Sequence, residues 1–259
     1  MIAMKALLNS YYRQPNKKFC FYSGGKNETI AKLLGVSEWD WTPEVPLYLE
    51  PLAGYTHTIP LGMGCEKIFT SENKEWVAPM IENPEDAYKI EVPSVYQGRT
   101  GEILDLIEEA LKENPDKKVR MPDIQSPLGV AELMWGESFY ISLITNPKEI
   151  HFLLDKITEF TIIYVKALQK VLGERGNPCC FPHIWSDPEG YYIADDTNSM
   201  VSPEMHLEYS VNYINKITDA VGPVHYHSCT WLPQYYENMK KVKNTKAMNW
   251  SIIVSTDPA

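Results

Sequence analysis

The sequence lacks an excess of positive charge. It holds 24 Lys and Arg residues against 34 Asp and Glu residues, which gives a net charge of −10 at pH 7. Nucleic-acid-binding surfaces are built from basic patches or stripes, so we expect no nucleic-acid partner. The acidic balance mainly supports solubility.

Long apolar runs and paired cysteines are missing as well. No window approaches the roughly 18 uninterrupted apolar residues that a membrane-spanning helix needs, and Ala6-Leu7-Leu8 is too short an apolar stretch for a signal peptide. The five cysteines are irregularly spaced, and Cys179 and Cys180 are adjacent, which is unfavourable for an ordinary disulfide. We therefore expect a cytoplasmic protein with reduced thiols and no membrane partner.

The second half of the chain alternates short apolar runs with amphipathic segments. Asn146 and Pro147 open the longest predicted helix, and Gly173 ends it. This alternation, with short connections, is typical of a parallel sheet or barrel. The 259 residues fit a single barrel domain of roughly 250 residues, with residues 1–80 as an irregular N-terminal extension. A strand running into a loop is predicted over 119–127, and further strands over 191–194, 224–229 and 247–254. Helices are predicted over 102–111, 202–222 and 231–242, and a hairpin within 61–69 and 75–81.

Three residues at alternate positions of one predicted strand carry metal-ligand side chains. His225, His227 and Cys229 share a face, because residues i, i+2 and i+4 of a strand point the same way. Imidazole and thiolate are preferred zinc ligands, and barrel enzymes keep their active sites where strands end at their carboxyl side. Buried histidines that only support the core are the alternative interpretation. Three ligand types at this spacing favour a metal or catalytic site.

Polar residues follow other predicted strands in the same way. Asp195 and Asp196 come directly after the strand 191–194 and are candidate catalytic residues, which could orient a substrate, complete a metal site or act as general acid and base. A capping or turn role is the plain alternative, since Asp is common in turns. The residues predicted to bind substrate at the same mouth are Gln125, Trp185, Tyr192 and Ser199.

The order of these motifs carries a family resemblance. Asp195 to Met205, followed by His227-Ser228-Cys229, resembles the uroporphyrinogen decarboxylase superfamily, and more closely its cobalamin-dependent methyltransferases. Gln125 to Ala131 and Asn146 to Glu149 support the resemblance, which extends over residues 75–259. It implies a TIM-type (β/α)8 barrel with an N-terminal extension. It also implies a zinc ion on a His-x-Cys pair, here His227 and Cys229, and a further, distant cysteine.

That further cysteine is missing, because no Cys follows Cys229. The chain stops soon after the sixth expected strand, so we expect it to be truncated at the C-terminus, with the last strands absent. If it is complete, the metal site needs another ligand, and His225, Asp196 and Glu204 are the candidates.

The resemblance implies two reactions. The methyltransferases move a methyl group between a small-molecule donor or thiol acceptor and a corrinoid (cobalamin) carried on a partner protein. The decarboxylases act on porphyrinogens through an Arg-rich N-terminal loop, whereas Lys18–Gly25 contains no Arg. We therefore expect a zinc-dependent, corrinoid-dependent methyltransferase, with uroporphyrinogen decarboxylase or a catalytically inactive relative as alternatives.

Overall fold

The structure is a computed structural model that describes residues 56–116, 118–178, 189–229 and 233–250. Its first described elements are the short helix α3 (Thr58–Gly62) and the strands β1 (Lys67–Phe69) and β2 (Glu75–Val77). The two strands pair antiparallel, with Lys67 opposite Val77, which confirms the predicted hairpin. Residues 1–55 of the expected N-terminal extension lie outside the described residues, as do Cys179, Cys180 and Trp185.

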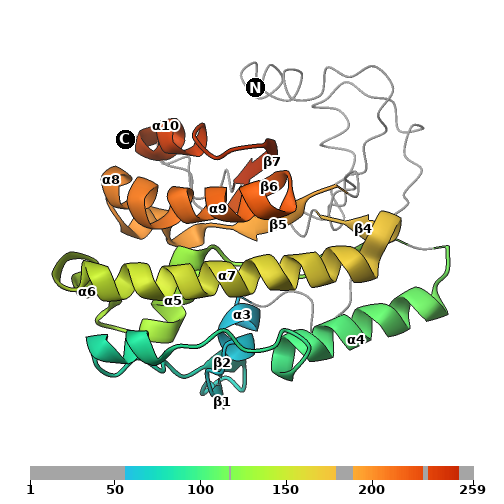
Figure 1. Ribbon diagram of the computed structural model, residues 1–259, viewed down its shortest axis with the longest axis horizontal. Helices are drawn as coiled ribbons and strands as arrows, with labels where there is room; N and C mark the ends of the chain where they lie inside the picture. Colours follow the sequence, from blue (N-terminus) through green and yellow to red (C-terminus); the bar gives the residue numbers. More distant parts are fainter. Residues whose placement is uncertain (1–55, 117, 179–188, 230–232, 251–259) are drawn as a thin grey trace.

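The helices that follow form the body of the molecule. In chain order they are η2 (Pro84–Lys89), α4 (Gly98–Glu113), α5 (Pro127–Trp135), α6 (Phe139–Thr145) and α7 (Pro147–Leu172). The long helix α7 runs through the middle of the molecule and packs against α4, α5 and α9 (Asn212–Val221) (Figure 1). Ile150, Leu153, Leu154 and Ile157 form its fully buried stripe, as a period of 3.6 residues requires.

Sequence signals predicted the ends of α7 correctly. Pro147 occupies its first turn, where a missing N–H costs nothing. Gly173 follows Leu172 with a φ of 51°, a left-handed conformation that favours glycine. The turn η3 (Gly173–Arg175) then leads into the next strand.

Two sets of parallel strands meet at one point of the fold. Strands β3 (Val119–Arg120) and β4 (Gly176–Asn177) form one pair, and β5 (Tyr191–Ala194), β6 (Val224–Ser228) and β7 (Thr245–Trp250) form a sheet in that order. Gln125 forms a parallel bridge with Ala194, and the Ser126 N–H donates to the Ala194 carbonyl at 2.7 Å. The carboxyl ends of the β3 segment and of β5 and β6 therefore lie together.

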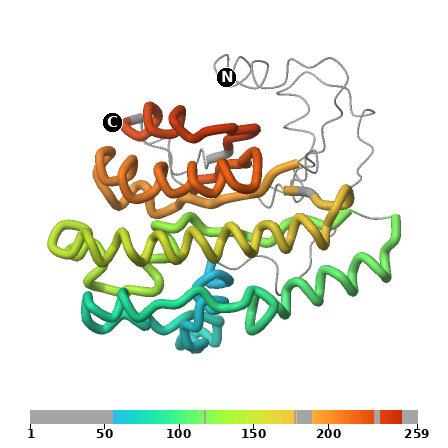
Figure 2. The backbone as a smooth tube through the Cα atoms, viewed as in Figure 1, coloured from blue at the N-terminus to red at the C-terminus, as the bar shows by residue number. Residues whose placement is uncertain are grey.

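The connections between these strands are helical. The turn η4 (Asp196–Met200), helix α8 (Pro203–His206), the π-helical turn η5 (Leu207–Val211) and α9 link β5 to β6, and the turn η6 (Pro233–Tyr235) and helix α10 (Tyr236–Met239) precede β7. Figure 2 shows that elements successive in the sequence are stacked across the molecule, from the α3–α4 region on one side to β7 and α10 on the other. The predicted α/β class is confirmed, and the closed eight-stranded barrel stays a prediction. No helix within the described ranges is long and apolar enough to span a bilayer.

Candidate metal centre and adjoining pocket

Three metal-ligand side chains meet where β5 and β6 end. Asp196 is the second residue after the end of β5. His227 lies in β6, and Cys229 is the first residue after β6. One ligand atom from each lies within 4.8 Å of those of the other two. His227 Nε2 is 3.3 Å from Cys229 Sγ and 3.7 Å from Asp196 Oδ1. We call these three residues the ligand cluster.

The geometry of the ligand cluster fits a zinc ion. Zinc bonds of roughly 2.0–2.3 Å in a tetrahedral arrangement place neighbouring ligand atoms about 3.5 Å apart, which matches the two separations at His227. Imidazole, thiolate and carboxylate are all zinc ligands, and a catalytic zinc keeps its fourth position for water or substrate. Three residues were candidates for the additional ligand, namely His225, Asp196 and Glu204. Of these, the fold brings Asp196 to the His227–Cys229 pair.

The backbone orients the carboxylate of this cluster. The Cys229 N–H donates to Asp196 Oδ1 at 2.6 Å, and the Asp196 side chain is 31% exposed. Burial of the sulfur, then the negative charge of Asp196, raise the pKa of the Cys229 thiol to about 12. A carboxylate and a thiolate held this close repel each other. A divalent cation bound between the carboxylate and the thiolate would remove that repulsion. The two side chains therefore suit a metal site.

The His227 ring is held by packing. It is 4% exposed, and it stacks on Tyr192 with ring centroids 5.8 Å apart and planes at 25°. Tyr192 itself is 2% exposed and lies opposite His225 on the neighbouring strand. The structure therefore places Tyr192, a predicted substrate-binding residue, where it supports the imidazole of His227.

Asp195 faces the opposite way from Asp196, into a buried polar network. His206 Nε2 lies 2.9 Å from its carboxylate, and the hydroxyls of Ser210 and Tyr226 each donate to it at 2.7 Å. All four residues are at most 1% exposed. Burial alone would raise the pKa of Asp195, but the hydrogen bond from His206 and others from Ser126 and Tyr226 outweigh burial and lower the pKa.

The network gives Asp195 a positioning role in this arrangement. Its N–H donates to the His227 carbonyl at 2.8 Å, which ties the end of β5 to β6, the strand that carries His227 and leads into Cys229. Ser210 reaches the carboxylate from the π-helical turn η5, and such turns are frequent at functional sites. The catalytic role predicted for Asp195 stays a prediction.

Asp123 is a residue near the cluster that sequence patterns missed. It precedes Gln125, whose amide donates to Asp123 Oδ2 at 3.0 Å, while Oδ1 is buried with no hydrogen-bond partner among the described residues. Burial raises the pKa of Asp123 to about 7, against the Gln125 hydrogen bond and with a further contribution from Asp196. Its position after a strand, like that of Asp195 and Asp196, was the available signal.

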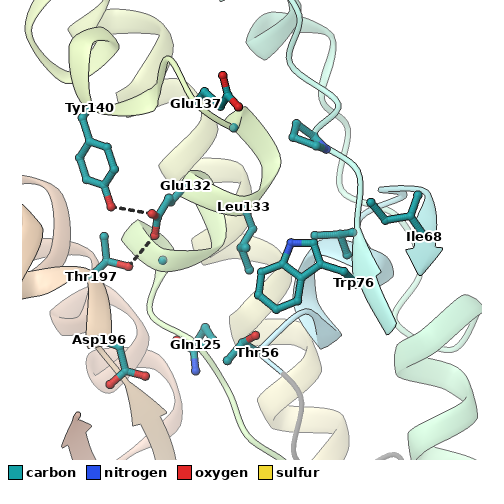
Figure 3. Close-up of a pocket in the computed structure, with 14 residues that line it drawn as sticks. Thr56, Ile68, Trp76, Gln125, Glu132, Leu133, Glu137, Tyr140, Asp196 and Thr197 are labelled. Atoms are coloured by element: carbon teal, nitrogen blue, oxygen red, sulfur yellow. Dashed lines mark hydrogen bonds between the residues drawn. The ribbon is translucent and has the colours of Figure 1, made fainter. Parts of the chain in front are cut away.

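A pocket of about 610 Å³ opens beside the cluster (Figure 3). Asp196 belongs to both the pocket and the cluster. The pocket wall combines apolar and aromatic side chains with carboxylates, and no Lys, Arg or His is among its lining residues in the part of the chain that is described. The lining side chains include Trp76, Gln125, Glu132, Glu137, Tyr140, Asp196 and Thr197.

The remaining predicted site residues lie apart from this centre or outside the described residues. Gln125 lines the pocket, whereas Ser199, on η4, is not among the lining residues. His225 is buried on β6, and Glu204 is exposed in the first turn of α8. Neither residue belongs to the ligand cluster, so the fold does not place these two candidate ligands beside His227 and Cys229. Trp185 falls in the segment that is not described.

Comparison with known families finds a match in the first part of the chain. Residues 52–173 match the family model described as uroporphyrinogen decarboxylase (URO-D). This match confirms the predicted resemblance to that superfamily, over residues that precede the acidic pair and the His-x-Cys strand.

The chain has relatives that are named for two different reactions. The chain is 28% identical over 175 residues to a uroporphyrinogen decarboxylase of Flavobacterium johnsoniae, covering 63% of this chain and 46% of that protein. It is 27% identical over 147 residues to the methylcobamide:CoM methyltransferase MtbA of Methanosarcina acetivorans, covering 55% of this chain and 38% of the relative. The matched regions thus span less than half of each relative's length.

A solved structure shares the fold. A methyltransferase from Methanosarcina mazei superposes with a TM-score of 0.65 at 17% identity, covering 93% of this chain and 74% of that one. At this identity the similarity shows the fold alone.

Proposed function

We propose that the chain is a zinc-dependent methyltransferase that moves a methyl group between a small-molecule donor or thiol acceptor and a corrinoid protein. The observation that carries the proposal is the cluster of Asp196, His227 and Cys229 beside a pocket large enough for a small molecule. A relative named as a methylcobamide:CoM methyltransferase supports the same reaction class.

The residues of the cluster have separable tasks under this proposal. His227 and Cys229 hold the ion, and Asp196, fixed by the Cys229 amide at 2.6 Å, completes its protein ligands. Bound zinc would supply Lewis-acid chemistry, which lowers the pKa of a coordinated thiol or polarises an oxygen of the methyl donor. Tyr192 holds the imidazole plane, and Asp195 ties β5 to β6, so the ligands are positioned before substrate arrives.

Asp123 favours a second candidate, decarboxylation of a porphyrinogen. A carboxyl with a pKa of about 7 is suited to proton transfer near neutral pH, and a relative is named as a uroporphyrinogen decarboxylase. The pocket opposes this candidate. A substrate with many carboxylates needs cationic partners, and none is found among the described lining residues.

Zinc analysis of purified variants tests the first proposal. The intact chain should carry about one zinc ion per molecule, measured by elemental analysis after dialysis. Cys229→Ala and His227→Ala remove a ligand each, and each should weaken zinc binding by more than about 100-fold, since even residues that only orient ligands cost 10–100-fold. Asp196→Asn should weaken it less, because an amide oxygen can still coordinate.

Matched controls carry the same chemical changes elsewhere. Cys65 is buried in the core, His151 lies on α7, and Asp105 is exposed on α4. Alanine at the first two, and Asn at Asp105, should leave zinc content unchanged. A chain without zinc that transfers methyl groups equally well with and without Cys229 would overturn the proposal. Tight binding of a carboxylated porphyrin, with release of CO₂, would favour the decarboxylase instead.

A further inference from the structure

The pocket beside the ligand cluster has an unbalanced charge. Its lining includes the carboxylates of Glu132, Glu137 and Asp196, and its described lining contains no cationic side chain. Zinc at the cluster would offset Asp196 and the Cys229 thiolate, but it would leave Glu132 without a compensating charge. The pocket wall therefore retains an excess negative charge even when the proposed metal site is filled.

Glu132 is held in place as a hydrogen-bond acceptor. The Tyr140 hydroxyl donates to Glu132 Oε1 at 2.5 Å, and the Thr197 hydroxyl donates to Oε2 at 3.0 Å (Figure 3). Burial, then the Glu132 carboxylate, raise the pKa of Tyr140, so the phenol keeps its proton and stays a donor. The carboxylate thus has a defined position, set by α5, α6 and η4 together.

An indole ring forms another part of the wall. Trp76, on β2, is 41% exposed, and Figure 3 shows it beside Leu133 and Thr56, across the pocket from Tyr140. The His57 ring packs near it, with centroids 5.9 Å apart at 57°. A partly exposed aromatic face in a pocket that also holds carboxylates is the combination that binds alkylated ammonium groups, and Trp binds them most strongly through its π-system.

We propose that this pocket recognises a small organic cation with an alkylated ammonium head group, which is the substrate of the site. This inference rests on the methyltransferase proposed above and names its substrate class. Glu132 supplies the fixed negative charge, and Trp76 supplies the aromatic face. An anionic substrate would instead lie near Glu132, whose uncompensated negative charge repels it.

The test uses a charged probe and its neutral equivalent in shape. Choline carries a trimethylammonium group, and 3,3-dimethylbutan-1-ol has the same outline without the charge. Calorimetric titration of the purified full chain should show choline binding at least tenfold more tightly than the alcohol, and binding that weakens as salt is raised. Equal binding of both probes, or no binding of choline, would overturn the inference.

Variants locate the binding in this pocket. Glu132→Gln keeps the acceptor for Tyr140 and removes the charge, and it should weaken choline binding at least tenfold without affecting the alcohol. Trp76→Leu should also weaken choline binding, and Trp76→Phe should weaken it less than Trp76→Leu does. Glu109→Gln makes the same charge change on the exposed face of α4 and should change nothing. Circular dichroism confirms that each variant is folded.

Failure of this inference is distinguishable from failure of the proposed reaction. Glu132 and Trp76 are not zinc ligands, so their variants should keep full zinc content. Cys229→Ala should lose zinc and still prefer choline over the alcohol. A chain that binds zinc but does not discriminate between the probes would reject the cationic substrate alone. Unchanged choline affinity in Glu132→Gln would reject this pocket as the cation site.

Discussion

Replacement of Asp195 by Ala should destabilise the fold far more than replacement of its neighbour Asp196. The Asp195 carboxylate accepts hydrogen bonds from Ser210 and Tyr226, pairs with His206, and is fully buried with them. Alanine leaves these three groups without their acceptor. Each unsatisfied buried group costs about 1–3 kcal/mol, and removal of one partner of a buried pair with a charged group costs about 3–5 kcal/mol.

We expect a loss of about 3–5 kcal/mol in the free energy of unfolding for Asp195→Ala, because relaxation and entering water recover part of the larger sum. For a domain of this size each kcal/mol lowers the melting temperature by about 2–4 °C, so the melting temperature should fall by about 10 °C. Urea denaturation followed by circular dichroism measures the free energy directly, and calorimetry measures the temperature.

Asp196→Ala is the matched comparison. Its side chain is 31% exposed and accepts one backbone N–H, so we expect a loss below about 1.5 kcal/mol together with loss of zinc. Asp195→Ala should retain measurable zinc below its melting temperature. Equal unfolding free energies for the two variants would refute the assignment of one acid to the core and the other to the site.

Other positions give independent tests. Burial lowers the pKa of His57 to about 4. Between pH 6.5 and 4 only the unfolded chain binds the proton, so the free energy of unfolding should fall by up to about 3 kcal/mol over this range. His57→Gln should remove this part of the pH dependence when denaturation is measured at each pH. Gly190→Ala places Cβ 2.1 Å from the Pro223 oxygen at a φ of 97° and should cost about 3 kcal/mol or more. Gly64→Ala, with φ 102° and nothing within 4 Å, should cost only about 1 kcal/mol; similar melting temperatures would contradict the clash. Ile157→Ala, at a fully buried position, should cost about 3 kcal/mol in urea and Ile157→Val about 1.

Helix ends and strand order were predictable because they depend on local chemistry. Asn146, Pro147 and Gly173 act through backbone preferences of single residues, and α7 begins and ends where they indicate. The hairpin and the strands β5 and β6 follow from short apolar runs in the same way. The closed barrel stays a prediction, because closure depends on contacts between distant segments, which no local pattern of residues specifies.

Helix α5 shows why other elements escaped prediction. Seven of its nine residues are buried, so it has little amphipathic periodicity to distinguish a helix from a buried strand. Its local signals were present, since Ser126 caps its first turn by accepting the Gly129 N–H at 3.2 Å and Pro127 follows. Glu132, the fixed carboxylate of the pocket, was missed because it lies within this helix and belongs to no motif.

The candidate site was predictable only in part for a similar reason. Strand alternation placed His227 and Cys229 on one side, and the structure brings them together. Alternation does not say which of two adjacent acids turns outward after a strand ends. That choice depends on His206, Ser210 and Tyr226, which come from other elements. Their hydrogen bonds hold the Asp195 carboxylate in the interior.

The hydrogen bond from the Cys229 amide to Asp196 has a thermodynamic consequence for metal exchange. Zinc-finger domains fold only when the ion is bound, because no site exists beforehand. In the proposed zinc site the backbone N–H of Cys229 already orients the carboxylate of Asp196, and the core around α7 and β6 stabilises the chain independently. Chelation should therefore strip the site without unfolding the protein, and reloading should be fast, since the ion meets a site whose reorganisation is already complete.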